Sequence, residues 1–151
     1  MTRRLNVAFI KAGWHAEIVD RALEGFVADM DAAGQEHQLE VLTVPGAFEM
    51  PLQAQRLAAS GRFDAVVAAA LVVDGGIYRH DFVAQAVVDG LMRVQLDTGV
   101  PTFSVSLTPH HFQTAEHETF FYDHFVKKGA EAARAVRMVA ALDTETTGAA
   151  E

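Results

Sequence analysis

Four short runs of apolar and β-branched residues divide this chain into repeating units, and no other feature limits its possible folds as much. Each run is followed by a stretch whose apolar residues have helical spacing, and the connections are long enough for right-handed crossovers. No two consecutive runs are joined by a hairpin-length loop. The order is therefore βαβαβαβα, which predicts a parallel sheet covered by helices on both faces. The runs are Leu5–Ile10, Leu39–Val44, Ala65–Val73 and Thr102–Leu107.

The helical stretches between the runs have recognisable ends. The clearest one carries apolar residues at the spacing of one helix face from Ile18 to Met30, and Gly34 is placed to end it. Pro51 fits the first turn of the second helix, because its missing N–H costs nothing there. Apolar residues at helical spacing from Val83 to Val94 predict the third.

The last helix sets the expected domain boundary. It is predicted from about Thr114 to Leu142, with Gly129 as a kink or break inside it. From Asp143 the chain is rich in Thr, Gly and Ala, so we expect one domain over residues 1–142 and a flexible tail over residues 143–151. The predicted architecture is α/β, a single-domain three-layer αβα fold with a four-stranded parallel sheet of the flavodoxin-like kind.

Composition excludes several classes of protein. The chain has no cysteine, which excludes disulfides, thiolate catalysis and thiolate metal ligands. Its net charge of −8, with no basic stripe, argues against nucleic-acid binding. No apolar run approaches the roughly 20 residues that a membrane-spanning helix needs. With no export signal in the sequence, we expect a soluble, cytoplasmic protein that has no membrane or nucleic-acid partner.

Two loops hold most of the chemically informative residues. The first reads Val-Pro-Gly-Ala-Phe-Glu over residues 44–49, and the second reads Val-Val-Asp-Gly-Gly-Ile-Tyr-Arg-His-Asp over residues 72–81. Each follows a predicted strand and precedes a predicted helix, so both should emerge at the edge of the sheet where α/β proteins bind ligands. Phe48 offers a stacking face and Glu49 a carboxylate. Glu49 is equally explained by the preference of acids for the positive end of a helix, and both explanations stay open.

The second loop combines glycines with titratable side chains. Gly75 and Gly76 would let backbone N–H groups approach an anion at a helix N-terminus, with the charge of Arg79 beside them. An ordinary tight turn explains the glycines as well, because no dinucleotide or P-loop pattern is present. His80 is the best acid/base candidate, since histidine exchanges protons near neutral pH, although many such histidines are surface or capping residues.

Trp14 is the only tryptophan and directly follows the first predicted strand, so it could stack on a planar ring at the same edge. Packing in the core or at an interface is the alternative for this residue. A group of histidines, His110, His111, His117 and His124, suggests a metal site at first sight. Their spacing matches no zinc motif, so we expect no metal.

In this order and spacing, the two loops resemble those of lumazine synthase, a family of riboflavin biosynthesis. The match extends to Lys-Lys-Gly-Ala-Glu-Ala-Ala at residues 127–133 and includes the family's Val-Pro-Gly-Ala-Phe-Glu segment intact. The resemblance implies a transferase that condenses 5-amino-6-(D-ribitylamino)uracil with 3,4-dihydroxy-2-butanone 4-phosphate, giving 6,7-dimethyl-8-ribityllumazine, phosphate and water. It implies no cofactor. Such a reaction needs proton transfer and the joining of two reactants more than a covalent nucleophile.

The resemblance also implies a role for each position of the site. His80 is the proton shuttle. An aromatic ring stacks on the pyrimidine, a carboxylate accepts hydrogen bonds from the ribityl hydroxyls, backbone groups contact the uracil ring, and a loop surrounds the phosphate. The resemblance implies that Trp14, with His15 beside it, stacks on the pyrimidine, and that Ala47, Phe48 and Glu49 hold the ribityl chain. It implies that Val72 and Val73 contact the uracil ring, and that Gly76, Ile77 and Tyr78 surround the phosphate.

Four positions depart from the commonest form of the family. There the catalytic histidine falls where Arg79 stands, and an aromatic residue takes the place of His80. Either the loop path brings His80 to the substrate, or Arg79 alters the chemistry. Ser104 replaces an aromatic residue of the fourth strand. The usual phosphate-binding arginine has no counterpart, which leaves Arg79, His117 and Lys128 as candidates for contacting the phosphate.

The segment from Pro109 to Val126 is slightly longer than in the common form and carries Phe120–Tyr122 and Phe125. These features are similar to the second type of lumazine synthase, which forms decamers from two pentamers. The resemblance therefore implies a homo-oligomer built from pentamers, expected to be a decamer, with sites between neighbouring subunits. The aromatic residues either form a buried subunit contact or pack on their own sheet.

Two alternatives to an enzyme stay open. The changes at Arg79 and at the missing arginine would also suit a non-catalytic flavin- or lumazine-binding protein on the same fold. An assembly module with a vestigial pocket is the third interpretation. The presence of Glu49 and His80 favours the enzyme.

Overall fold

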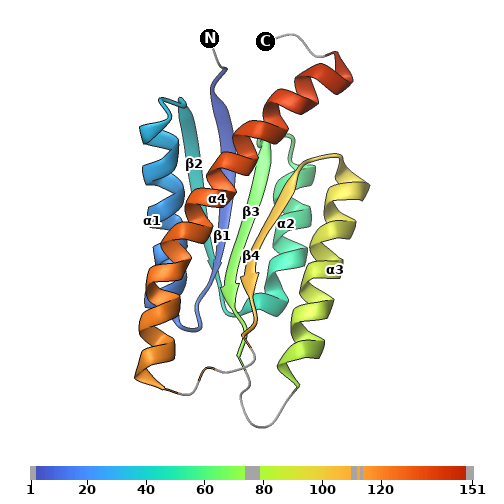
Figure 1. Ribbon diagram of the computed structural model, residues 1–151. Helices are drawn as coiled ribbons and strands as arrows, with labels where there is room; N and C mark the ends of the chain where they lie inside the picture. The colour runs from blue at the N-terminus through green and yellow to red at the C-terminus, as the bar shows by residue number, and fades with distance from the viewer. Residues whose placement is uncertain (1–2, 74–78, 110–111, 113, 149–151) are drawn as a thin grey trace.

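The computed structural model describes residues 3–73, 79–109, 112 and 114–148. Within them, four parallel strands form one sheet in the order β2-β1-β3-β4, and helices connect each strand to the next (Figure 1). The predicted three-layer α/β fold and its βαβαβαβα order are confirmed, and the strand order is the flavodoxin-like one. The elements are β1 (Leu5–Ala12), α1 (Ala16–Ala32), β2 (His37–Val44), a short 3₁₀ turn (Ala47–Glu49), α2 (Met50–Ala59), β3 (Ala65–Leu71), α3 (His80–Thr98), β4 (Thr102–Leu107) and α4 (Ala115–Thr147).

Two hydrophobic cores lie on opposite faces of the sheet. Successive side chains of a strand point to opposite faces, so β1 and β3 contribute to both cores. Phe9 and Val67 pack with α1 and α4, whereas Ile10 and Val66 pack with α2 and α3. Every residue of β3 is buried, as expected for a central strand of a parallel sheet.

The predicted strands differ from the observed ones mainly at their ends. The prediction for β4 is confirmed, while β1 continues beyond Ile10 to Ala12 and β2 begins earlier, at His37. The third strand ends at Leu71, short of the predicted Val73, because its ladder with β4 ends there. The next two residues are still apolar because their side chains pack on the two opposite cores.

Helix α4 is longer than predicted. The helix begins where predicted, and the side-chain oxygen of Thr114 caps it by accepting a hydrogen bond from the backbone N–H of His117 at 3.2 Å. The helix then runs without a break to Thr147, so the predicted end at Leu142 was wrong. A domain boundary after residue 142 stays a prediction. In the part of the chain that is described, no helix is both long and apolar enough to cross a bilayer.

Of the kink or break predicted at Gly129, the break is wrong, since α4 is continuous through this glycine, which lies where α4 crosses α1. A Cβ atom at Gly129 would lie 1.9 Å from the carbonyl oxygen of Ala22. On the facing helix, a Cβ at Gly25 would lie 2.0 Å from the carbonyl oxygen of Val126. Glycine is therefore required at both positions by the close approach of two backbones.

The chain path leaves a crevice at one edge of the sheet. From β1 the chain passes through α1 to β2 on one side, and α2 then brings it back across the other face to β3 on the far side of β1. All four strands end at the same edge, and α3 and α4 begin near it (Figure 1). Ligands of open α/β sheets bind where the path diverges in this way, here at the ends of β1 and β3.

Candidate active site

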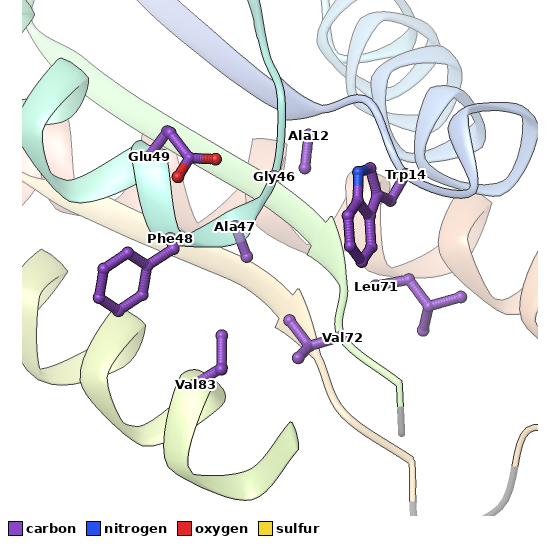
Figure 2. Close-up of a pocket in the computed structure, with 9 residues that line it drawn as sticks. All are labelled: Ala12, Trp14, Gly46, Ala47, Phe48, Glu49, Leu71, Val72 and Val83. Carbon is purple, nitrogen blue, oxygen red and sulfur yellow. The ribbon is translucent and has the colours of Figure 1, made fainter. Parts of the chain in front are cut away.

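A cavity of ≈ 280 Å³ occupies this crevice. Its walls come from the ends of β1 and β3, the loop and 3₁₀ turn after β2, and the first turn of α3 (Figure 2). Most of the lining is apolar, with one carboxylate and one indole ring, a combination suited to a small organic ligand with a planar part and a polar part. The lining residues are Ala12, Trp14, Gly46, Ala47, Phe48, Glu49, Leu71, Val72 and Val83.

Two aromatic rings border the cavity. Trp14 follows β1 and Phe48 lies in the 3₁₀ turn, and Figure 2 shows their rings on opposite sides of Ala47 and Val72. Their exposed fractions are 62% and 65%, although large aromatic side chains are normally well buried. Two accessible rings beside an apolar cavity can stack on a planar ligand. The predicted position of Trp14 directly after β1, at the edge where the parallel strands end, is confirmed.

The segment after β2 presents the carboxylate. Gly46 is extended, and Ala47–Glu49 then form the 3₁₀ turn that leads directly into α2, whose first turn contains Pro51. The Glu49 carboxylate lies over Gly46, because a Cβ atom added there would be 3.3 Å from Glu49 Oε1. Among the described residues, no hydrogen bond or ion pair engages this carboxylate. It lies at the positive end of α2 and is also able to accept hydrogen bonds from a ligand. The structure therefore agrees with both explanations for Glu49, the preference of acids for a helix N-terminus and a role in ligand binding.

The end of β3 forms one wall of the cavity, and some of its backbone groups already make hydrogen bonds within the chain. The N–H of Val72 donates to the carbonyl of Leu107 at 2.8 Å, and the Val72 carbonyl accepts from Thr108 Oγ1 at 2.7 Å. A carbonyl oxygen has a second lone pair, so Val72 can still accept a hydrogen bond from a ligand. Val73 packs its side chain toward the α1 and α4 core, away from the α2 and α3 core that Val72 contacts.

The start of α3 carries the predicted acid/base group and the nearest positive charge. His80 is the first residue of the helix and is half-buried, three positions before the cavity residue Val83 and hence on a neighbouring part of the same face. The Arg79 guanidinium donates to Asp81 from Nε at 3.2 Å and from Nη2 at 3.0 Å, and it lies 4.5 Å above the Phe82 ring. This hydrogen-bonded guanidinium lowers the pKa of the Asp81 carboxyl below its usual range.

Comparison with known proteins decides the family. A sequence profile described as 6,7-dimethyl-8-ribityllumazine synthase matches residues 4–143, nearly the whole chain. The chain belongs to the lumazine synthase family. A protein of this name from Rhodococcus erythropolis is 65% identical over 133 residues, which cover 87% of this chain and 86% of the relative.

Two further relatives carry a number in their names. The protein named 6,7-dimethyl-8-ribityllumazine synthase 2 from Pseudomonas syringae pv. tomato is 59% identical over 85% of this chain and 77% of its own length. The one from Bradyrhizobium diazoefficiens is 52% identical over 86% of this chain and 79% of its own length. These names agree with the resemblance to the second type of lumazine synthase.

Seven described residues implied by the lumazine synthase resemblance do not line the cavity of their own chain. Val73, Arg79 and His80 are described above, and the other four are His15, Ser104, His117 and Lys128. The ring of His15 packs edge-to-face on Phe112, at a centroid distance of 5.0 Å. Ser104 lies exposed on the edge strand β4, and His117 lies in the first turn of α4. Lys128 pairs with Glu131 at 3.1 Å and lies roughly 20 Å along α4 from its first residue. Gly76, Ile77 and Tyr78, like His110 and His111, lie outside the described residues.

Four residues that line the cavity were not predicted from the sequence: Ala12, Gly46, Leu71 and Val83. Three of them flank residues that were predicted, at the ends of β1 and β3 and in the loop after β2. Val83 was assigned only to a helix face. Its place in the first turn of a helix that begins at the ligand-binding edge was the available signal.

Proposed function

We propose that this chain catalyses the condensation of 5-amino-6-(D-ribitylamino)uracil with 3,4-dihydroxy-2-butanone 4-phosphate to 6,7-dimethyl-8-ribityllumazine, phosphate and water, as a transferase of riboflavin biosynthesis. The observation that carries the proposal is the cavity at the ends of β1 and β3, which combines an accessible indole, an unengaged carboxylate and apolar walls. Membership of the lumazine synthase family supports it over residues 4–143.

In the proposed complex, the pyrimidine stacks on Trp14 and is held at its edge by backbone groups of Val72 and Val73. The ribityl chain runs along residues 47–49, where Glu49 accepts hydrogen bonds from its hydroxyls. A carboxylate acceptor binds hydroxyl groups about twice as strongly as a neutral one. This places the two amino groups of the pyrimidine toward the start of α3.

The second substrate is proposed to bind with its phosphate near Gly76–Tyr78 and Arg79. Two N–H groups of Arg79 are engaged by Asp81, which leaves its Nη1 amino group to donate to a phosphate oxygen. His80 then moves protons as the amine adds to the ketone, water leaves and phosphate is eliminated. Holding both substrates in one cavity supplies much of the remaining rate enhancement, since proximity replaces a bimolecular encounter.

The site is proposed to be completed by a neighbouring copy of the chain. In support, Ser104, His117 and Lys128, which the resemblance implies as substrate-binding residues, do not line the cavity of their own chain. The expected assembly is a pentamer or a decamer of two pentamers. Of the aromatic residues in α4, Phe121 and Phe125 pack in their own core, whereas Phe120 and Tyr122 are 56% and 41% exposed and remain available for a subunit contact.

Complementation tests the shared site. Glu49→Ala and Lys128→Ala would impair the site from opposite sides, so subunits mixed after dissociation should regenerate intact sites at about one quarter of the total. Activity of the mixture equal to the mean of the two variants would refute a shared site. Sedimentation velocity on the wild-type protein gives the number of subunits independently.

The first test of the reaction is steady-state formation of 6,7-dimethyl-8-ribityllumazine, followed by its absorbance and fluorescence against the uncatalysed background. Saturable formation well above background is the expected result. No acceleration, together with tight binding of the pyrimidine or of riboflavin, would refute the enzyme and indicate a binding protein. No binding of either compound would indicate an assembly module. A cytoplasmic location stays a prediction.

A further inference from the structure

His15 has a backbone conformation that side chains normally avoid. Its φ of 55° and ψ of 46° lie in the left-handed helical region, and among the described residues it is the only non-glycine with a positive φ. Histidine tolerates this region better than most residues, but the conformation still costs free energy. Such strain persists only where surrounding contacts hold it, and it is often found at functional sites.

Contacts on both sides of Trp14 fix this strained turn. The carbonyl of His15 accepts hydrogen bonds from the N–H groups of Ile18 and Val19, both at 3.0 Å, which begins α1. On the other side of Trp14, the N–H of Gly13 donates to the carbonyls at the end of β2. The backbone that carries the cavity indole is therefore held from two directions.

The ring of His15 provides a third contact, and it is directed away from the cavity. It packs edge-to-face on Phe112 at 5.0 Å, and Phe112 in turn packs on Phe121 of α4 at 6.0 Å. The hollow that His15 lines is a separate one, between the first turns of α1 and α4. Its side chain is thus joined to the connection between β4 and α4, while its neighbour Trp14 lines the binding cavity.

We propose that His15 is a positioning residue for Trp14. Its left-handed backbone turns the chain so that the indole lies over the cavity, and its contact with Phe112 keeps that turn in place. His15 itself does not touch the substrate. The choice of the pyrimidine as the ring that stacks on Trp14 rests on the proposed function, whereas the orientation of Trp14 in the free protein does not.

Intrinsic fluorescence tests the proposal directly, because Trp14 is the only tryptophan of the chain. His15→Gly accepts the left-handed conformation without strain but removes the ring, and Phe112→Ala removes the ring contact while leaving His15 in place. His15→Asn also tolerates this backbone conformation and lacks the imidazole ring, so it provides a second test of the ring contact should the glycine variant fold poorly. Phe120→Leu is the matched control, because Phe120 belongs to the same aromatic group but has no ring contact with His15 or Phe112.

The expected result has two parts. In the free protein, His15→Gly and Phe112→Ala lower the fluorescence anisotropy of Trp14 and increase its quenching by acrylamide, while Phe120→Leu changes neither. With substrate, the KM for the pyrimidine rises about tenfold in the first two variants, the size of a weakened aromatic stack, and kcat changes little. The unfolding midpoint of His15→Gly stays near the wild-type value because lost strain offsets the lost contact, so poorer binding would not reflect poorer folding.

Unchanged anisotropy and quenching in both His15→Gly and Phe112→Ala would overturn the proposal. A rise in KM for the His15 variants alone, with normal Trp14 fluorescence and a normal Phe112→Ala, would also overturn it and indicate direct contact between His15 and the substrate. Failure of the enzyme to form product would refute the proposed function. The fluorescence of the free protein would still decide the role of His15.

Discussion

Replacing Gly129 by alanine tests the packing of α1 against α4, whose backbones approach closely at this glycine. The added Cβ would lie 1.9 Å from the carbonyl oxygen of Ala22 and 2.7 Å from its carbon. An unstrained carbon-to-oxygen contact needs about 3.3 Å. The two helices must therefore separate by roughly 1.4 Å along this direction, because a backbone carbonyl has no rotamer through which to move away.

The size of the effect follows from two opposing terms. Alanine is favoured over glycine inside a helix by about 1 kcal/mol, which stabilises the variant. Overpacking of a core costs about 1–3 kcal/mol and more where the obstacle is rigid, so we assign about 4 kcal/mol to this backbone clash. Separation also weakens the contacts of Phe26 and Phe125, which are fully buried in the same core. We expect a net loss of about 3 kcal/mol in the free energy of unfolding, and a Tm lower by about 6–12 °C.

Urea denaturation at matched protein concentration is the appropriate assay, since assembly would make stability concentration-dependent. Gly90→Ala in α3 is the comparison variant, because its Cβ would meet the Pro51 ring at 2.9 and 3.0 Å, a smaller overlap than the one at Gly129, and it should cost less. Gly25→Ala faces the same helix crossing from the other side, so combining it with Gly129→Ala should cost less than the sum. A Gly129→Ala protein as stable as the wild type would refute the close crossing.

Three further predictions concern the site. His80→Ala should lower kcat by roughly ten- to a thousandfold, because general acid/base transfer is lost while the positioning of the substrates survives. An unchanged kcat at saturating substrate would show that His80 is not part of the mechanism. Glu49→Gln should raise the KM for the ribityl substrate about tenfold without changing that for the four-carbon phosphate, since a charged acceptor is replaced by a neutral one; equal shifts in both would contradict this role. Asp81 has a lowered pKa because of its hydrogen bonds from Arg79, so its contribution to stability is present above the usual carboxyl pKa and is lost as the pH falls below about 4. Asp81→Asn should flatten that part of the curve of urea midpoint against pH, and an unchanged slope would show that the ion pair does not form.

The sequence predicted most of the fold and about half of the cavity for one reason. Strands, helix faces and caps depend on residues close together in the chain, so the runs of apolar residues, Pro51 and Thr114 could be interpreted locally. Parallel strands all end at one edge of a sheet, so the order of the elements alone predicted that Trp14 and the loop of residues 44–49 lie at the same edge. The segment Val-Pro-Gly-Ala-Phe-Glu indicated the family, and the match over residues 4–143 confirmed it.

The tertiary structure decided what depends on distances between remote segments. Gly129 was predicted to kink or break a helix because glycine is a poor helix former, but glycine is needed there because of Ala22 on another helix, which no local pattern contains. The contact of His15 with Phe112 likewise joins segments far apart in the chain, and it is the basis for the proposal that His15 supports its neighbour. Local sequence thus determined which elements form and where their polar ends meet, whereas the approach of packed backbones and rings determined which residues face the cavity.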